Sequence, residues 1–211
     1  MVRGYVENTD KGKALLKMNL DYWEDYYREP RNGNPSLFAR FCLPYTEPTN
    51  SVLDLGCGNG RDSFFFSKKG LNVTGIDGSA QAIKGCESLK NGTLPSFRKL
   101  NFADIDKLDI FPDYIYLRFV LCAIDEAEQK KLFSWISSHI KNKGKFFIET
   151  RSINDKIVSN DDHTRRFVGK MLLESQIKDL GFTILYSKEK RNFAPIKNGN
   201  PLLIRLIGEK K

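Results

Sequence analysis

Long apolar runs are absent from this sequence, and histidine and cysteine are scarce. No apolar stretch approaches the ~20 residues that a helix needs to cross a bilayer. The first residues, Met1 to Glu7, contain no apolar segment of the kind that a secretory signal requires. The chain has 2 histidines and 4 cysteines, without a Cys-x-x-Cys pair. These absences predict a cytoplasmic protein with reduced thiols, no metal site and no membrane partner.

The sequence does have enough apolar material for one folded domain, together with an excess of positive charge. Its 211 residues are 40% hydrophobic and 12% aromatic, which is typical of a globular chain rather than a disordered one. The formal net charge of +8 suits an anionic partner such as a phosphorylated metabolite, a nucleotide-sugar or RNA. Because the lysines are scattered, a solvated basic surface explains the charge as well.

Short apolar segments alternate with helical patterns along most of the chain. We expect strands at residues 51–55, 72–76, 96–100, 114–119 and 145–150, and helices at 61–69, 79–89, 126–140 and 167–180. Two further strands, 182–188 and 202–207, have no helix between them and should be antiparallel. The predicted fold class is α/β, a Rossmann-like three-layer αβα sandwich with a mostly parallel seven-stranded sheet and a C-terminal antiparallel hairpin.

The segment before this alternation is predicted to be helical. Residues 10–28 carry apolar and aromatic side chains at helical spacing, and residues 36–43 resemble a short second helix. Trp23 and Tyr27 lie one helical turn apart, a spacing that core packing alone also explains. No linker or repeat divides the chain. We therefore expect a single domain, residues 1–211, in which a helical segment, 1–45, precedes a core, 51–208.

A glycine-rich turn follows the first predicted strand of the core. The segment from Val52 to Asp62 contains Gly-x-Gly-x-Gly, formed by Gly56, Gly58 and Gly60, with Asp54 two residues before it. Glycines allow a ligand to approach the backbone, and the following helix offers amide donors at its N-terminus. The position of Asp54 on the strand favours an ammonium group over a pyrophosphate. Capping of the turn is the alternative role for this aspartate.

Two more carboxylates follow the next two strands. Asp77 ends the second strand, where it can accept hydrogen bonds from both hydroxyls of a ribose, or instead cap the next helix. Asp104 follows the third strand, where it can accept from an adenine amino group while Phe102 or Ile105 flanks the ring. Parallel strands bring their carboxyl ends to one edge of a sheet, so these residues should converge there.

These motifs resemble those of class I S-adenosylmethionine (SAM)-dependent methyltransferases, over about residues 51–208. The resemblance implies that residues 56–60 wrap the methionine part of SAM, that Asp77 holds the ribose, and that S-adenosylhomocysteine (SAH) is the product. The stretch from Gly58 to Ser63 is similar to tellurite- and thiopurine-type enzymes, in which an early aromatic helix closes over SAM as a lid. The implied cofactor-binding residues are Trp23, Tyr27, Asp54, Gly56, Gly58, Arg61, Asp77, Gly78, Asp104, Ile105 and Arg118.

The acceptor is expected beside the fourth and fifth strands. Arg118, at the end of the fourth, can pair with a carboxylate of SAM or of the acceptor. The Asn/Asp-Pro-Pro-aromatic signature of enzymes that methylate nucleic-acid bases is absent there, which makes nucleic acid a weaker candidate. After the fifth strand, His163 is the candidate general base. Arg151, Arg165 and Arg166 are candidates for clamping an anion, although a solvated charged loop is the other interpretation.

The sequence therefore predicts methyl transfer from SAM to a small anionic acceptor, phosphorylated or sugar-derived, at oxygen. A similarity of the tail after the fifth strand to methyltransferases of bacterial surface-polysaccharide gene sets favours this acceptor class. The alternatives are S-methylation of a thiol or an oxyanion such as tellurite, RNA methylation, and a non-catalytic SAM-binding domain. No prediction of the oligomeric state follows from the sequence.

Overall fold

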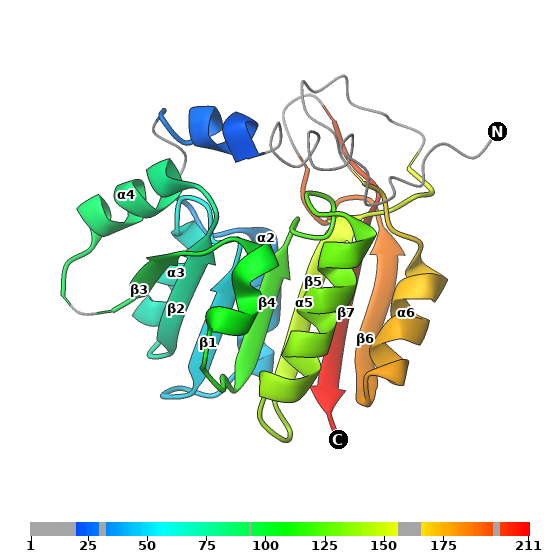
Figure 1. The fold of residues 1–211 in the computed structure, drawn as a ribbon. Helices are drawn as coiled ribbons and strands as arrows, with labels where there is room; N and C mark the ends of the chain where they lie inside the picture. Colours follow the sequence, from blue (N-terminus) through cyan, green and yellow to red (C-terminus); the bar gives the residue numbers. More distant parts are fainter. Residues whose placement is uncertain (1–19, 30–32, 93, 156–165, 196–198) are drawn as a thin grey trace.

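A seven-stranded sheet forms the centre of the protein, in the order β3-β2-β1-β4-β5-β7-β6 (Figure 1). The computed structural model describes residues 20–29, 33–92, 94–155, 166–195 and 199–211. β1 to β5 are parallel where they pair, and β7 pairs antiparallel with both β5 and β6. The strands are β1 (Ser51–Leu55), β2 (Asn72–Asp77), β3 (Ser96–Lys99), β4 (Tyr114–Arg118), β5 (Lys145–Arg151), β6 (Phe182–Lys190) and β7 (Leu203–Lys210).

Helices begin where capping residues and periodic apolar side chains place them. α5 begins after Asp125, whose side chain accepts from the Glu128 amide in a capping box. α6 begins at Lys170, later than expected, because Val168 forms a bridge to Ser152. The helical segments are residues 20–26, α2 (Leu37–Cys42), η1 (Leu43–Tyr45), α3 (Arg61–Lys68), α4 (Ala80–Leu89), η2 (Phe102–Lys107), α5 (Glu126–His139) and α6 (Lys170–Asp179).

The sheet has an apolar core on each face, which gives the three layers of the sandwich. On one face, α5 and α6 pack through residues such as Leu132 and Leu173. On the other face, α2 and α3 pack through Phe38 and Phe66. Central strands that are covered on both faces are mostly apolar, and Tyr114 to Leu117 in β4 are all buried. The predicted fold class is confirmed.

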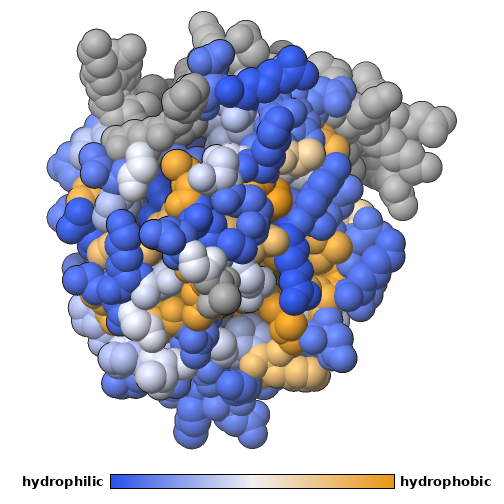
Figure 2. All heavy atoms as spheres, turned by 90° about the vertical axis from the view of Figure 1, so that its left-hand side faces the viewer, coloured by the Kyte–Doolittle hydropathy of each residue, from blue (hydrophilic) through white to orange (hydrophobic). Residues whose placement is uncertain are grey.

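The outer edge at β3 is short and charged. Figure 2 shows the side of the molecule that carries α4 and β3, where a mostly hydrophilic surface is broken by small separate apolar patches. Arg98 and Lys99, at the end of β3, are exposed. Charges on a short edge strand discourage pairing with other chains. In the described part of the chain, none of the helices has the length and apolarity that a membrane span needs.

Candidate active site

The loop between β1 and α3 contains glycines, so parts of its backbone are not covered by side chains. Gly56 and Gly58 have φ angles of +71° and +54°, in the left-handed region that favours glycine. A Cβ at Gly56 would lie 2.7 Å from Val120 Cγ2, and a Cβ at Gly58 would collide with the Tyr27 hydroxyl. The Gly56 amide donates to the Ile76 carbonyl at 2.8 Å, which holds the loop against β2. Side chains at these two glycines would therefore disrupt the site.

Asp77, at the end of β2, stabilises the same loop through hydrogen bonds. Its Oδ2 accepts from the Gly58 amide at 2.9 Å, and its Oδ1 accepts from the Ser79 amide at 2.8 Å. Burial raises the pKa of this carboxyl, although both amides oppose the shift. Gly78 allows Asn101 Oδ1 to come within 2.8 Å of where a Cβ would stand. The carboxylate retains lone pairs that can accept from a ligand.

Asp54 is a buried carboxyl in β1, only 2% exposed. Ser63 Oγ donates to its Oδ2 at 2.6 Å, and this is the one hydrogen bond that the Asp54 side chain makes with the described residues. Burial raises its pKa to about 7, even though the Ser63 hydroxyl and the charge of Arg118 lower it. A carboxyl in this state gains stability when a cation approaches, because the cation favours the ionised form.

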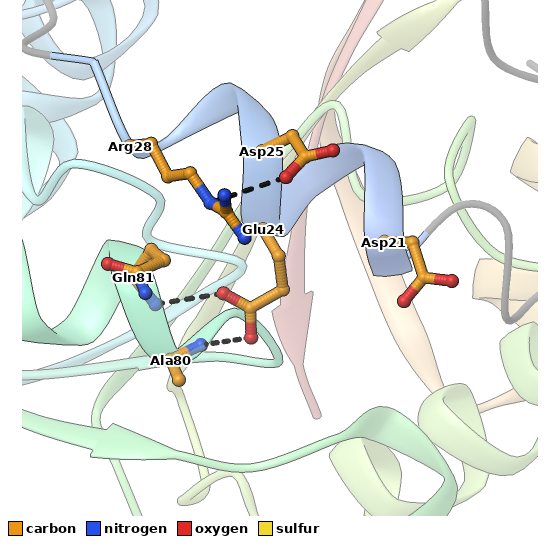
Figure 3. Close-up of a pocket in the computed structure, with 6 residues that line it drawn as sticks. All are labelled: Asp21, Glu24, Asp25, Arg28, Ala80 and Gln81. Atoms are coloured by element: carbon orange, nitrogen blue, oxygen red, sulfur yellow. Dashed lines mark hydrogen bonds and ion pairs between the residues drawn. The ribbon is translucent and has the colours of Figure 1, made fainter.

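The helix at residues 20–26 is fastened to α4 by Glu24. Its Oε1 accepts from the Ala80 amide at 2.8 Å, and its Oε2 accepts from the Gln81 amide at 3.0 Å (Figure 3). Oε2 also accepts from Ser79 Oγ at 2.9 Å. The amides at the start of α4 otherwise lack intrahelical partners. These hydrogen bonds lower the pKa of Glu24 despite its partial burial. The hollow beside this contact measures about 380 Å³ and is lined by Asp21, Glu24, Asp25, Arg28, Ala80 and Gln81.

Tyr27 reaches from the end of this helical segment onto the glycine loop. Its hydroxyl lies against Gly58, and Trp23 stacks on its ring with centroids 5.9 Å apart. Burial raises the pKa of Tyr27 well above its usual value, and the nearby charge of Arg61 opposes this. Arg61 is the first residue of α3. The predicted residues Trp23, Tyr27 and Arg61 therefore gather around the loop.

The third predicted cofactor-binding region, in η2, is more exposed to solvent than the first two. Asp104 forms an ion pair with Lys107 at 2.7 Å, and its side chain is 42% exposed. Ile105 is completely buried in the core, so its side chain is not at the surface. Phe102 is half-buried, and its ring lies 3.8 Å from where a Gly56 Cβ would stand. Of the two residues considered as flanks for a bound ring, Phe102 lies beside the glycine loop.

Two arginines share one buried glutamate at the ends of β4, β5 and β7. Arg118 Nε donates to Glu149 Oε1 at 2.9 Å, and Arg205 Nε donates to Glu149 Oε2 at 2.7 Å. Burial raises the pKa of Glu149, although both guanidinium groups lower it. Arg118 lies 4.3 Å from the Phe119 ring centroid, and Arg205 lies 4.3 Å from that of Phe193. We call Arg118, Glu149 and Arg205 the arginine–glutamate cluster. It carries one net positive charge when all three side chains are ionised.

The other predicted acceptor-site residues are only partly described. His163 and Arg165 lie outside the described residues. Arg151 ends β5, and its carbonyl accepts from the Val168 amide at 3.0 Å. These positions remain predictions.

Arg166 is engaged with the segment that follows β4. Its Nε donates to the Ile124 carbonyl and its Nη2 to the Leu121 carbonyl, both at 3.1 Å, and Nη2 also bonds Gln129 Oε1. The Arg166 amide donates to the Cys122 carbonyl at 2.9 Å. This guanidinium therefore holds the β4–α5 connection in place.

Three functional candidates were missed by the sequence reasoning. Glu149 and Arg205 each interrupt an apolar strand, and a charge buried in a strand needs a charged partner, so this signal was present. Glu24 gave no comparable signal, because one acid on a helix with other exposed acids looks like a solvated side chain.

The fold and this site define a Rossmann-like SAM-dependent methyltransferase. A family described as a methyltransferase domain matches residues 22–186, and the chain belongs to that family. Comparison with curated protein sequences gives no match.

Solved structures share this fold at low sequence identity. A SAM-dependent methyltransferase from Methanosarcina mazei is 20% identical over 81% of this chain and 96% of its own, with a TM-score of 0.67. TehB from Haemophilus influenzae is 19% identical over 92% of this chain and 67% of its own, with a TM-score of 0.70. Magnesium protoporphyrin IX methyltransferase from Synechocystis PCC 6803, with SAM bound, is 17% identical over 100% of this chain and 87% of its own, with a TM-score of 0.61.

SAM is the cofactor of this class, and the residues at the sheet edge fit it. The bare backbone at Gly56 and Gly58 leaves room for close approach. The buried Asp54 suits a cationic ligand, because it has a single neutral hydrogen-bond donor among the described residues. Asp77 suits hydroxyl donors such as those of a ribose.

Proposed function

We propose that the protein methylates a small anionic acceptor at oxygen, with phosphorylated and sugar-derived compounds as the first candidates. The observation that supports this is the guanidinium of Arg118. Its Nε is bound to Glu149, while its two terminal nitrogens have no hydrogen bond to any described residue. The side chain is only 17% exposed. Donors held in a partly dry position bind a carboxylate or phosphate more strongly than donors in open solvent do.

The position of Arg118 connects this anion site to the cofactor loop. Arg118 is the last residue of β4, and Leu117 just before it pairs with Leu55 of β1, which leads into Gly56. When bound, SAM supplies an electrophilic methyl group on a sulfonium. The protein then contributes mainly by holding the acceptor oxygen in line with that methyl group, so the anchor for the acceptor must lie nearby.

The carboxylates and the arginines lie on different sides of the site, as the opposite charges of the two ligands require. Asp54 and Asp77 lie at the ends of β1 and β2, where a cationic cofactor gains from them. Arg118 and Arg205 lie on the other side, where an anionic acceptor gains, and Glu149 limits their repulsion of a nearby sulfonium. In this proposal His163 acts as the general base, the chain is a single domain, and the location is cytoplasmic. Of the predicted lid, residues 1–45, α2 belongs to the core, so the part that acts as a lid is the segment before α2.

Turnover with a panel of phosphorylated sugars, hydroxy acids, thiols and RNA tests the proposal. We expect Arg118→Met to raise KM for anionic acceptors about tenfold or more, while SAH affinity changes little. Arg40→Met is the matched control, because Arg40 is exposed, lies over the Phe65 ring, and has no hydrogen bond or ion pair to the arginine–glutamate cluster in the described chain. Unchanged KM in Arg118→Met would overturn the anionic acceptor.

The variant His163→Ala separates the chemical alternatives. An alcohol oxygen needs a general base, so its methylation should be lost when the imidazole is removed. Methylation of a thiolate or an oxyanion needs no base and should survive. Strongly salt-dependent binding of RNA, with methyl transfer to it, would favour RNA as the acceptor instead.

A further inference from the structure

Phe119 has a backbone conformation that aromatic residues rarely adopt. Its φ is +61°, and it is the one aromatic among the four described non-glycine residues with positive φ. Glycine and asparagine are the usual residues in this region, because a Cβ followed by a bulky ring meets the adjacent carbonyl. The Phe119 amide donates to the Glu149 carbonyl at 2.8 Å, and the Cys122 thiol donates to the Phe119 carbonyl at 3.0 Å. The surrounding chain therefore maintains the strain.

Core packing does not account for this phenylalanine. Phe119 belongs to none of the three apolar clusters formed by the described residues, either as a member or as a residue packed against one. It is partly exposed. Its ring contacts the Arg118 guanidinium, which lies 4.3 Å from the ring centroid. A strained aromatic outside the core, next to a functional loop, is a candidate for ligand contact.

The location of Phe119 points to the acceptor. It follows Arg118 directly, and the next residue, Val120, packs against Gly56 of the cofactor loop. Phe119 therefore connects the arginine–glutamate cluster, which its ring contacts through Arg118, to the residue that packs against the loop expected to hold the methionine part of SAM. A flat apolar surface beside an anion-binding guanidinium suits a ligand with a flat ring and a negative substituent.

We propose that the acceptor is a planar conjugated anion, whose ring packs on Phe119 while its negative group pairs with Arg118. This inference rests on the proposed anionic acceptor and narrows it. Phe119 is then a specificity-determining residue that selects planar rings over saturated ones of equal charge. The strain at Phe119 is tolerated because no residue better suited to the backbone would provide that surface.

A pair of matched probes tests this selection on the full chain saturated with SAH. The probes are 4-hydroxybenzoate and trans-4-hydroxycyclohexanecarboxylate, which share a carboxylate and a hydroxyl and differ in the planarity of the ring. We expect calorimetry to show the planar probe binding about fivefold more tightly, the size expected of one aromatic contact. Phe119→Gly should bring the two affinities to within about twofold of each other.

The variant and its control keep the test independent of folding. Glycine favours a φ of +61°, so Phe119→Gly should fold, which far-UV circular dichroism and SAH affinity will verify. Phe111→Gly is the matched control, because Phe111 is 55% exposed and stacks on His139 of α5. The preference for the planar probe should persist in Phe111→Gly.

The outcomes separate the two proposals. Equal affinity for the two probes, or a preference that survives Phe119→Gly, would overturn the planar acceptor and leave the anionic one standing. Failure of both probes to bind while SAH binds normally would also overturn the planar acceptor. In that case, turnover with a saturated phosphorylated acceptor would still support the proposed function. A lack of turnover with every anionic acceptor of the panel would overturn the proposed function as well.

Discussion

The two halves of the site differ in charge and in how far apart their partners lie in the chain. On the β1–β2 side, Asp54 bonds Ser63 and Asp77 bonds Gly58, contacts that span 9 and 19 residues. On the β4–β7 side, Glu149 bonds Arg118 and Arg205 across 31 and 56 residues. The first half is acidic and local, whereas the second is rich in arginine and assembled from distant strands. In the proposed function, cofactor binding therefore depends on a short motif, and acceptor binding depends on the completed sheet.

The strongest test of this difference is to remove the acid that both arginines share. Glu149→Gln leaves two buried guanidinium groups without a carboxylate, and we expect the free energy of unfolding to fall by about 4 kcal/mol. Urea denaturation monitored by circular dichroism measures the change. Glu209→Gln, in the same sheet, is the control, because its pair with Lys145 is longer at 3.8 Å and partly exposed. A loss equal to that of the control would show that the arginine–glutamate cluster is no more than a surface interaction.

On the acidic side, we expect the effect of Asp54 to depend on pH. In the folded protein its pKa rises from 3.8 to about 7, so between these values the folded state holds a proton that the unfolded chain has released. Stability should therefore fall as the pH rises from about 4 to about 7, by roughly 4 kcal/mol at most, and change little from this group above that range.

Denaturation at several pH values measures this slope and shows which residue causes it. Asp54→Asn should flatten the dependence, because the amide does not titrate. Ser63→Ala keeps the carboxyl and removes the hydroxyl donor that lowers its pKa, so the loss of stability should continue to a higher pH than in the wild type. A slope that is identical in the wild type and Asp54→Asn would show that Asp54 is not the titrating group.

Two of the three acids expected to contact SAM, Asp77 and Asp104, should not contribute equally. Asp77→Ala removes the acceptor of the Gly58 and Ser79 amides, so we expect SAH affinity to fall about a hundredfold with the fold retained. Asp104→Asn should change it less than about threefold, because Asp104 is half-exposed and already paired with Lys107. Calorimetry on both variants tests the ranking. Equal losses would mean that adenine recognition depends on η2 as strongly as ribose recognition depends on β2.

Local signals explain why the fold, and the positions of the acids and glycines at the edge of the sheet, were predicted from the sequence. Asp54, Asp77 and the loop glycines follow strands whose apolar pattern is continuous, so their positions at the sheet edge follow from topology. The half of the site that is proposed to bind the acceptor was only partly predicted. Arg118 was identified because it ends a strand, but Glu149 and Arg205 become partners only once β7 inserts antiparallel beside β5. The conformation of Phe119 depends on bonds to Glu149 and Cys122 that no local pattern encodes.

A smaller effect than that of Asp77→Ala is expected at Glu24, which joins the helix at residues 20–26 to the start of α4. Glu24→Gln keeps an oxygen for one amide and removes the charge that favours a helix N-terminus, so we expect SAH affinity to fall about fivefold. Asp21→Asn is the matched control, since Asp21 lines the same hollow and no hydrogen bond joins it to α4 in the described chain (Figure 3). If Glu24 fastens a lid, its loss should act mainly by speeding SAH dissociation in stopped-flow experiments. A fivefold change in the association rate alone would mean that Glu24 steers the cofactor without holding the helix in place.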